Sequence, residues 1–172
     1  MGMSSHQSAR PQSVDWLTPP SILGRLGAFD LDPCCPKIMP WPTATRMICV
    51  PQDGLAADWD GRVWLNPPFG NAARPWAERL AKHGNGIALL PARTETRLWQ
   101  EFVFGKASGV LFLAGRPHFY GPDGTRGPHN CGAPIALVAY GVRNLLALSA
   151  SGLAGYLVDV SGPLGSQNGG VA

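Results

Sequence analysis

The stretch VWLNPPFG, residues 63–70, begins as a short apolar strand and ends at a polar amide, two prolines and an aromatic ring. Consecutive apolar residues predict a strand that is buried on both faces, as the central strands of a parallel sheet are. The two prolines cannot continue such a strand, because proline has no N–H to donate to a neighbouring strand. We therefore expect Asn66 to stand where the strand ends.

The same pattern of a short apolar run that stops at a turn residue or a proline occurs elsewhere along the chain. Its other examples are AFDLDPCC (28–35), GIALLPA (86–92), GVLFLAG (109–115) and APIALVAYG (133–141), with RMICV (46–50) as a weaker candidate. Helical patterns lie in TPPSILGRLG (18–27), PWAERLAKHG (75–84) and TRLWQEFVFG (96–105). The first of these helices is expected to have Thr18 as its N-cap and Pro19 at its first position. Alternating strands and helices predict an α/β fold, a three-layer sandwich around a mostly parallel sheet.

Length and composition indicate one domain with modest positive charge. The 172 residues suit a single hydrophobic core, and we expect it to span 14–160, between a flexible polar arm at 1–13 and a flexible Gly-rich tail at 161–172. With 14 basic and 11 acidic residues, the charge is compatible with a nucleic-acid partner. The chain has no signal-like segment and no apolar run of about 18 residues, so we expect a cytoplasmic protein without a membrane partner.

The cysteines suggest neither a metal site nor a disulfide framework. There are four of them, Cys34, Cys35, Cys49 and Cys131, and no two form a CxxC pair. Because stable disulfides are rare in the cytoplasm, we expect buried free thiols and no bound metal.

Polar residues follow several of the predicted strands. Asp32 with Pro33, the segment 66–69, and the segment 91–93 all fall at or near the carboxyl end of a strand. Ligands of open α/β sheets bind in the crevice beyond these ends. We expect the three segments to border one such crevice.

The residues that follow the 63–65 strand suit a planar amino group. The Asn66 amide oxygen and the Pro67 carbonyl offer two acceptors for the two hydrogens of an NH₂ group, and proline fixes the backbone that carries them. Phe69 offers a face on which a flat heterocycle could stack. The alternative is a strand that ends in a proline turn, with Phe69 in the hydrophobic core.

This tetrapeptide, NPPF, resembles the (D/N/S)PP(Y/F) motif of amino-group methyltransferases that use S-adenosylmethionine. Together with DWLTPP (15–20), FDLDPCC (29–35), QDGLAADWDGRVWLNPPFG (52–70), ALLPARTETRLWQEFV (88–103) and GRPHF (115–119), it resembles the phage-type DNA N-6-adenine methyltransferase family from about residue 15 to about residue 140. The resemblance implies a Rossmann-like methyltransferase fold. It also implies methyl transfer from S-adenosylmethionine to adenine N6 in DNA. Enzymes of this kind are encoded by phages and prophages and take part in restriction–modification systems.

The resemblance assigns roles to residues of several blocks. The catalytic motif that holds and stacks the adenine would be Asn66, Pro67, Pro68 and Phe69. The cofactor would be bound by Trp16, Thr18, Pro19, Asp32, Pro33 and Asp53. Of these, Asp32 would face the ammonium group or fix the loop around it, and Asp53 would face the ribose or adenine. DNA would be contacted by Arg93, Arg97, Arg116 and Phe119.

Each of these assignments has a structural alternative. Thr18 and Pro19 could simply begin a helix, and Asp53 could be a solvated turn residue. The arginines could be solvated, and Phe119 could pack beneath the long connection 115–134, whose length of about 20 residues is itself typical of a functional loop.

Two other functions share the same motif. A methyltransferase could act on an amine or amide of RNA or protein, since the acceptor pair recognises an NH₂ group rather than DNA. A nucleic-acid-binding module that has lost its cofactor is the second alternative, favoured by the absence of a GxG sequence after the 28–35 strand.

Overall fold

The structure is a computed structural model that describes residues 16–161. The arm expected at 1–13 lies outside this range, as does the expected tail apart from Ser161. The elements in chain order are α1 (Pro20–Leu26), β1 (Leu31–Cys35), β2 (Arg46–Cys49), β3 (Val63–Leu65), the 3₁₀ turn η1 (Gly70–Ala72), α2 (Ala73–His83), β4 (Gly86–Pro91), the π-helical η2 (Trp99–Val103), β5 (Gly109–Leu113), β6 (Ile135–Tyr140), α3 (Val142–Ala150) and β7 (Gly155–Asp159).

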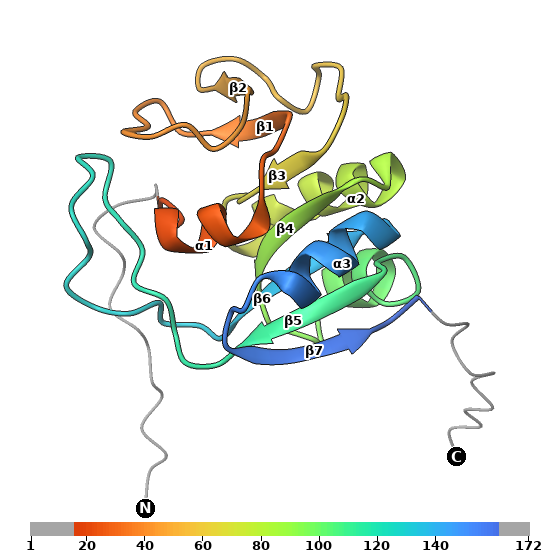
Figure 1. The fold of residues 1–172 in the computed structure, drawn as a ribbon. Helices are drawn as coiled ribbons and strands as arrows, with labels where there is room; N and C mark the ends of the chain where they lie inside the picture. Colours follow the sequence, from red (N-terminus) through yellow and green to blue (C-terminus); the bar gives the residue numbers. More distant parts are fainter. Residues whose placement is uncertain (1–15, 162–172) are drawn as a thin grey trace, which may run out of the picture.

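The strands form one seven-stranded sheet in the order β2-β1-β3-β4-β6-β5-β7 (Figure 1). The neighbours β2, β1, β3 and β4 are parallel, whereas β6 is antiparallel to both β4 and β5, and β7 is antiparallel to β5. The fold is therefore α/β, as expected, but the sheet is mixed. The expectation that the 133–141 run forms a parallel strand is wrong, because a continuous apolar run reports burial on both faces and not strand direction.

Helices cover both faces of the sheet, and the strand residues alternate between two cores. Ile22 of α1 and Leu148 of α3 belong to one hydrophobic cluster, into which Leu89 of β4 points. The other face carries α2 and η2, whose cluster takes in the next strand residue, Leu90. Successive side chains of a strand point to opposite faces, so β4 contributes to both cores. This confirms the three layers.

The helices differ from expectation at their starts. Helix α1 begins at Pro20 with Pro19 as its N-cap residue, and no side chain caps it, so the assignment of Thr18 as N-cap is wrong. Thr18 is instead almost fully buried, at 1% exposure. Helix α2 ends as expected at Gly84, which adopts a left-handed φ of 74° that glycine accepts without strain.

Two loops on the same side of the sheet pack against each other. The 36–45 loop, between β1 and β2, lies on the same side as the 115–134 connection (Figure 1). The two meet where the rings of Trp41 and Tyr120 lie edge to face, with centroids 5.3 Å apart. Leu17 also pairs with Tyr120 in an isolated antiparallel bridge. The long connection is thus joined to the segment that precedes α1. None of the helices within residues 16–161 has the length and apolar character needed to cross a membrane.

Candidate active site

A cavity of about 180 Å³ lies at the carboxyl ends of the parallel strands β1, β2 and β3. This is the edge where open α/β sheets bind their ligands. The cavity brings together eight of the predicted site residues, namely Trp16, Thr18, Asp32, Pro33, Asn66, Pro67, Pro68 and Phe69. Residues from three separate parts of the sequence therefore border one space.

The motif after β3 supplies one wall of this cavity. The Nδ2 group of Asn66 donates a hydrogen bond to the main-chain carbonyl of Trp16, 2.7 Å away. A carbonyl can only accept, so this contact fixes which end of the amide faces Trp16. The Oδ1 atom is turned away, and no donor among residues 16–161 takes it up. Within residues 16–161, this acceptor thus remains available to a ligand.

Phe69 lies at the rim of the same wall. Its side chain is 36% exposed, so the alternative that it belongs to the core does not describe its position. Phe119 is the buried partner, at 2% exposure, and packs against both Phe69 and Trp16. Phe119 does not line the cavity itself. Phe119 therefore packs beneath the 115–134 connection, which was the alternative to a contact with the DNA base.

Thr18 contributes a polar atom without a partner. Its Oγ1 is buried and has no hydrogen bond within residues 16–161, while the residue lines the cavity. An unsatisfied buried hydroxyl costs about 1–3 kcal/mol, and such groups are rare in folded proteins. A ligand that bonds to this hydroxyl would remove the cost.

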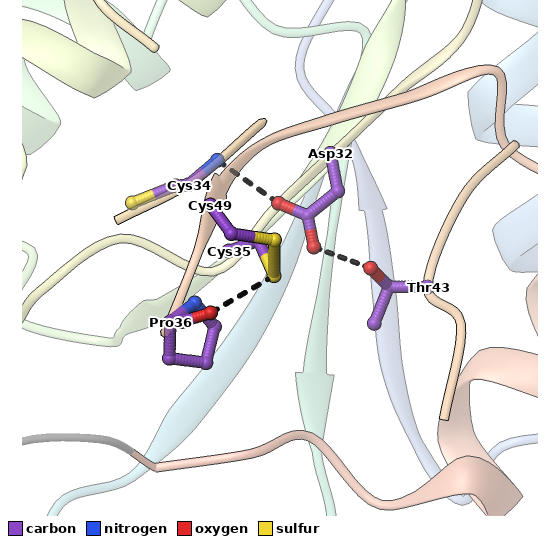
Figure 2. Close-up of a disulfide and its surroundings, with 6 residues drawn as sticks. All are labelled: Asp32, Cys34, Cys35, Pro36, Thr43 and Cys49. Carbon is purple, nitrogen blue, oxygen red and sulfur yellow. Dashed lines mark hydrogen bonds between the residues drawn. A yellow bond between two sulfur atoms is a disulfide. The ribbon is translucent and has the colours of Figure 1, made fainter. Parts of the chain in front are cut away.

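Asp32 is the buried carboxylate of the site, at 3% exposure. Its two oxygens accept hydrogen bonds from the Cys34 backbone N–H, at 3.0 Å, and from the Thr43 hydroxyl (Figure 2). Burial raises the pKa of Asp32 to about 6, although both hydrogen bonds lower it. Asp32 therefore changes charge at about pH 6, and each oxygen keeps a further lone pair for a ligand.

Cys35 and Cys49 form a disulfide that joins β1 to β2 (Figure 2). The expectation of four free thiols is wrong for this pair, because the two cysteines face each other in the register of the parallel strands, with Cα atoms 4.2 Å apart. Cys34 and Cys131 are free. Burial, followed by the charge of Asp32, raises the pKa of Cys34 to about 12, so this thiol stays protonated.

The turn after β2 closes the cavity with residues other than the one predicted. Asp53 does not line the cavity, and its carboxylate accepts the backbone N–H groups of Leu55 and Ala56 instead. This is the contact of a turn residue. Gln52 lines the cavity next to it, and Gly54 lies so close to β1 that a Cβ atom there would be 1.8 Å from the Pro33 carbonyl oxygen. Only glycine fits this approach.

The predicted DNA-contacting arginines lie outside the cavity. Arg93 is exposed in the connection after β4. Arg97 forms an ion pair with Glu101 on the next helical turn, at 2.8 Å, and is 83% exposed. Arg116 donates to the Gly132 carbonyl across the base of the 115–134 connection, at 3.3 Å. Pro19 also lies outside the cavity, at the start of α1.

The sequence did not identify several residues that line the cavity, among them Thr43, Gln52, Trp64 and Trp76. Trp64 carried a usable signal, since it belongs to β3 and lies two positions before Asn66. Thr43 carried none, because its contact with Asp32 depends on how the 36–45 loop folds back. Among residues 16–161, no group of three or more His, Cys, Asp or Glu residues is arranged to hold a metal ion.

The arrangement can bind a planar group and polarise it. It combines an uncharged amide acceptor, an aromatic rim, a buried carboxylate and an orphaned hydroxyl within one cavity. No family model, curated protein or solved structure matches this chain.

Proposed function

We propose that this chain is an S-adenosylmethionine-dependent methyltransferase that acts on the N6 amino group of adenine in DNA. The observation that carries the proposal is the orientation of Asn66, whose Nδ2 is held by the Trp16 carbonyl while its Oδ1 remains available beside the cavity. An NH₂ group on a flat ring suits this acceptor together with the adjacent Pro67 carbonyl. The resemblance of residues 15–140 to the phage-type adenine methyltransferases supports the same function.

The motif would act mainly through electrostatics. S-adenosylmethionine supplies the methyl group from a sulfonium centre. As the target nitrogen accepts the methyl group, it gains positive charge, and the Asn66 and Pro67 oxygens would stabilise this charge more strongly in the transition state than in the ground state. Phe69 would hold the base by stacking and present its π face to the developing cation.

The polar residues at the cavity fit the methionine end of the cofactor. The Asp32 carboxylate would bind the ammonium group, and the orphaned Thr18 hydroxyl would bond to the carboxylate. The enclosed volume of about 180 Å³ is below the roughly 300–1,000 Å³ of most ligand pockets, so the cavity would enclose only part of the cofactor. The rest would lie along the open side.

The arginines outside the cavity are candidates for phosphate contacts. Arg93 and Arg97 are exposed and lie on the segment that follows β4, a strand of the same parallel group as β3. Guanidinium groups bind phosphates through paired hydrogen bonds, and such contacts position a protein on DNA without reading its sequence. The 115–134 connection, the termini or a dimer partner would read the bases, which favours a short recognition sequence.

Transfer of a labelled methyl group from S-adenosylmethionine tests the proposal. We expect incorporation into an adenine-containing duplex, none into a duplex without adenine, and loss of about 100-fold or more in Asn66→Ala. Cofactor and DNA binding should fall much less, because most DNA affinity comes from phosphates. Asn71→Ala, an exposed amide of η1, is the matched control and should keep wild-type activity.

Each of three outcomes would contradict the proposed function and indicate another one. Incorporation only into RNA or protein would assign the acceptor pair to another amine or amide. Binding of DNA without any binding of S-adenosylmethionine, measured by calorimetry and thermal stabilisation, would identify a binding module. An unchanged rate in Asn66→Ala would show that NPPF only terminates a strand.

A further inference from the structure

The segment before α1 contacts the motif through its backbone. The Trp16 carbonyl accepts the Asn66 Nδ2 hydrogen bond at 2.7 Å across a separation of 50 residues. Because a carbonyl oxygen cannot donate, it selects a side chain that presents a donor at this point. An ionised carboxylate in place of the amide would set two oxygen atoms against each other with no hydrogen between them.

The position of this carbonyl is fixed by the long connection. The backbone N–H of Leu17 donates to the Tyr120 carbonyl, and the N–H of Tyr120 donates to the Leu17 carbonyl, both at 3.0 Å. Leu17 and Phe119 are each 2% exposed, and the ring of Phe119 lies 6.4 Å from that of Trp16. A paired backbone with buried neighbours holds its carbonyl more rigidly than a lone side-chain contact would.

We propose that the Trp16 carbonyl, held by the backbone pairing of Leu17 with Tyr120, is the positioning group that orients the Asn66 amide. Its presence requires that residue 66 have an uncharged side chain that can both donate and accept a hydrogen bond. This inference rests on the proposed function, because it explains how the acceptor for the target amine is aimed. It also defines the substrate class more closely. A neutral acceptor suits the neutral amino group of a nucleobase, whereas a carboxylate would favour a cationic amine.

The consequence is that aspartate should not replace Asn66, although the motif that this chain resembles allows Asp. An aspartate can imitate the amide only when it is protonated, since its O–H can then donate to Trp16 while its C=O faces the target. The Asn66→Asp variant should therefore be nearly inactive at alkaline pH and regain activity as the pH falls. The gain should be about tenfold per pH unit above the pKa of the new carboxyl group.

Other titratable groups could also make the rate depend on pH, so the experiment needs controls for them. Asp32 and Cys34 line the same cavity, and His118 precedes Phe119 in the loop. All three are also present in the wild type, so the rate is expressed as a ratio to wild type at each pH. The Asn66→Asp change is repeated in an Asp32→Asn background, where the rate is expressed as a ratio to Asp32→Asn alone. This background removes repulsion between two carboxylates as the cause of the pH dependence.

The experiment measures single-turnover methylation of an adenine-containing duplex at saturating cofactor and DNA, between about pH 5 and pH 8.5. We expect the ratio for Asn66→Asp to rise as the pH falls, in both backgrounds, and the ratio for the matched control Asn71→Asp to stay flat. A flat ratio for Asn66→Asp, or full activity at alkaline pH, would overturn the positioning role while leaving the methyltransferase intact.

The unfolding free energy gives a second readout that needs no activity. A carboxyl group that must stay protonated to donate to Trp16 has a raised folded-state pKa. The folded Asn66→Asp variant then binds more protons than the unfolded chain, and its stability relative to wild type falls as the pH rises. If the wild-type protein does not methylate DNA, the proposed function is refuted but the positioning role of Trp16 is not. A relative stability that does not change with pH would refute the positioning by Trp16.

Discussion

The rings of Phe69 and Phe119 meet edge to face, with centroids 6.2 Å apart and an interplanar angle of 75°. The two side chains differ in burial, since Phe119 is 2% exposed and Phe69 is 36% exposed. Edge-to-face contacts of this kind stabilise an aromatic pair beyond the area that it buries. Phe119 therefore supports the ring that lies at the cavity rim, and the two phenylalanines have separate roles.

Because the two phenylalanines have separate roles, replacing each by alanine should affect a different property, stability for Phe119 and base binding for Phe69. Phe119→Ala should lower the free energy of unfolding by about 3–5 kcal/mol, because it empties a buried site between Trp16 and Phe69. Phe69→Ala should change stability much less and should weaken binding of the target base by about 1–3 kcal/mol. Chemical denaturation and the affinity for a substrate duplex measure the two effects. Equal losses of stability in both variants would contradict the assignment.

The disulfide should stabilise the edge of the sheet. Cys35 and Cys49 are separated by 14 residues, and a crosslink that closes a loop of this length contributes about 3 kcal/mol by restricting the unfolded chain. Reductant and the Cys49→Ser substitution should each lower the free energy of unfolding by about this amount, and reductant should not lower it further in the variant. Cys131→Ser is the control, because Cys131 is a free thiol. Equal stability with and without reductant would refute the contribution.

Asp32 should make stability depend on pH. Its folded-state pKa, raised by burial to about 6, lies above the ordinary value of 3.8, so the folded chain binds the extra proton between these values. Stability therefore falls as the pH rises from about 4 to about 6, by up to about 3 kcal/mol from this group. Asp32→Asn should remove that loss, so its stability relative to wild type should increase over this range.

Denaturant unfolding at a series of pH values tests this prediction. Asp60→Asn, which removes an exposed carboxylate, is the matched control. A constant difference between Asp32→Asn and wild type over the whole range would show that Asp32 does not titrate there.

Local pattern in the sequence was enough to predict most of the fold. Apolar runs that stop at proline or glycine identified five strands, and apolar periodicity ending at Gly84 identified α2. The π-helical η2 and the helix α1 were also found in their expected places. The direction of β6 could not be predicted, because its six residues are all buried and such a run is compatible with either direction.

Elements at the edge of the sheet gave weaker signals. None of the residues of strand β7 is fully buried, and Tyr156 is 75% exposed, so its apolar pattern is diluted. Helix α3 was not predicted either. Its exposed side carries the apolar Val142 and Leu146, and its buried side carries the polar Asn144 beside Leu148. Both features obscure the amphipathic periodicity.

The site was predictable where one segment carried the chemistry and not where folding brought segments together. Asn66 and its neighbours form a contiguous motif at a strand end, and they line the cavity as expected. The contact between Asn66 and Trp16 depends on where the 16–18 segment packs, and the pairing of Cys35 with Cys49 depends on strand register. Asp53 failed to reach the cavity because the turn that it caps presents Gln52 instead.

The orphaned hydroxyl of Thr18 makes the last prediction, which separates a ligand-binding role from a structural one. Its Oγ1 is buried at the cavity and has no hydrogen bond within residues 16–161. Thr18→Val keeps the shape of the side chain and removes the hydroxyl. The ligand-free variant should therefore be as stable as wild type, or more stable by up to about 1–3 kcal/mol. The affinity for S-adenosylmethionine should fall, by about 1.5–3 kcal/mol if the hydroxyl bonds to the cofactor's carboxylate. Thr18→Ser retains the hydroxyl and should keep most of the affinity. Calorimetric titration of the three proteins with the cofactor decides between the roles, and wild-type affinity in Thr18→Val would remove Thr18 from the binding site.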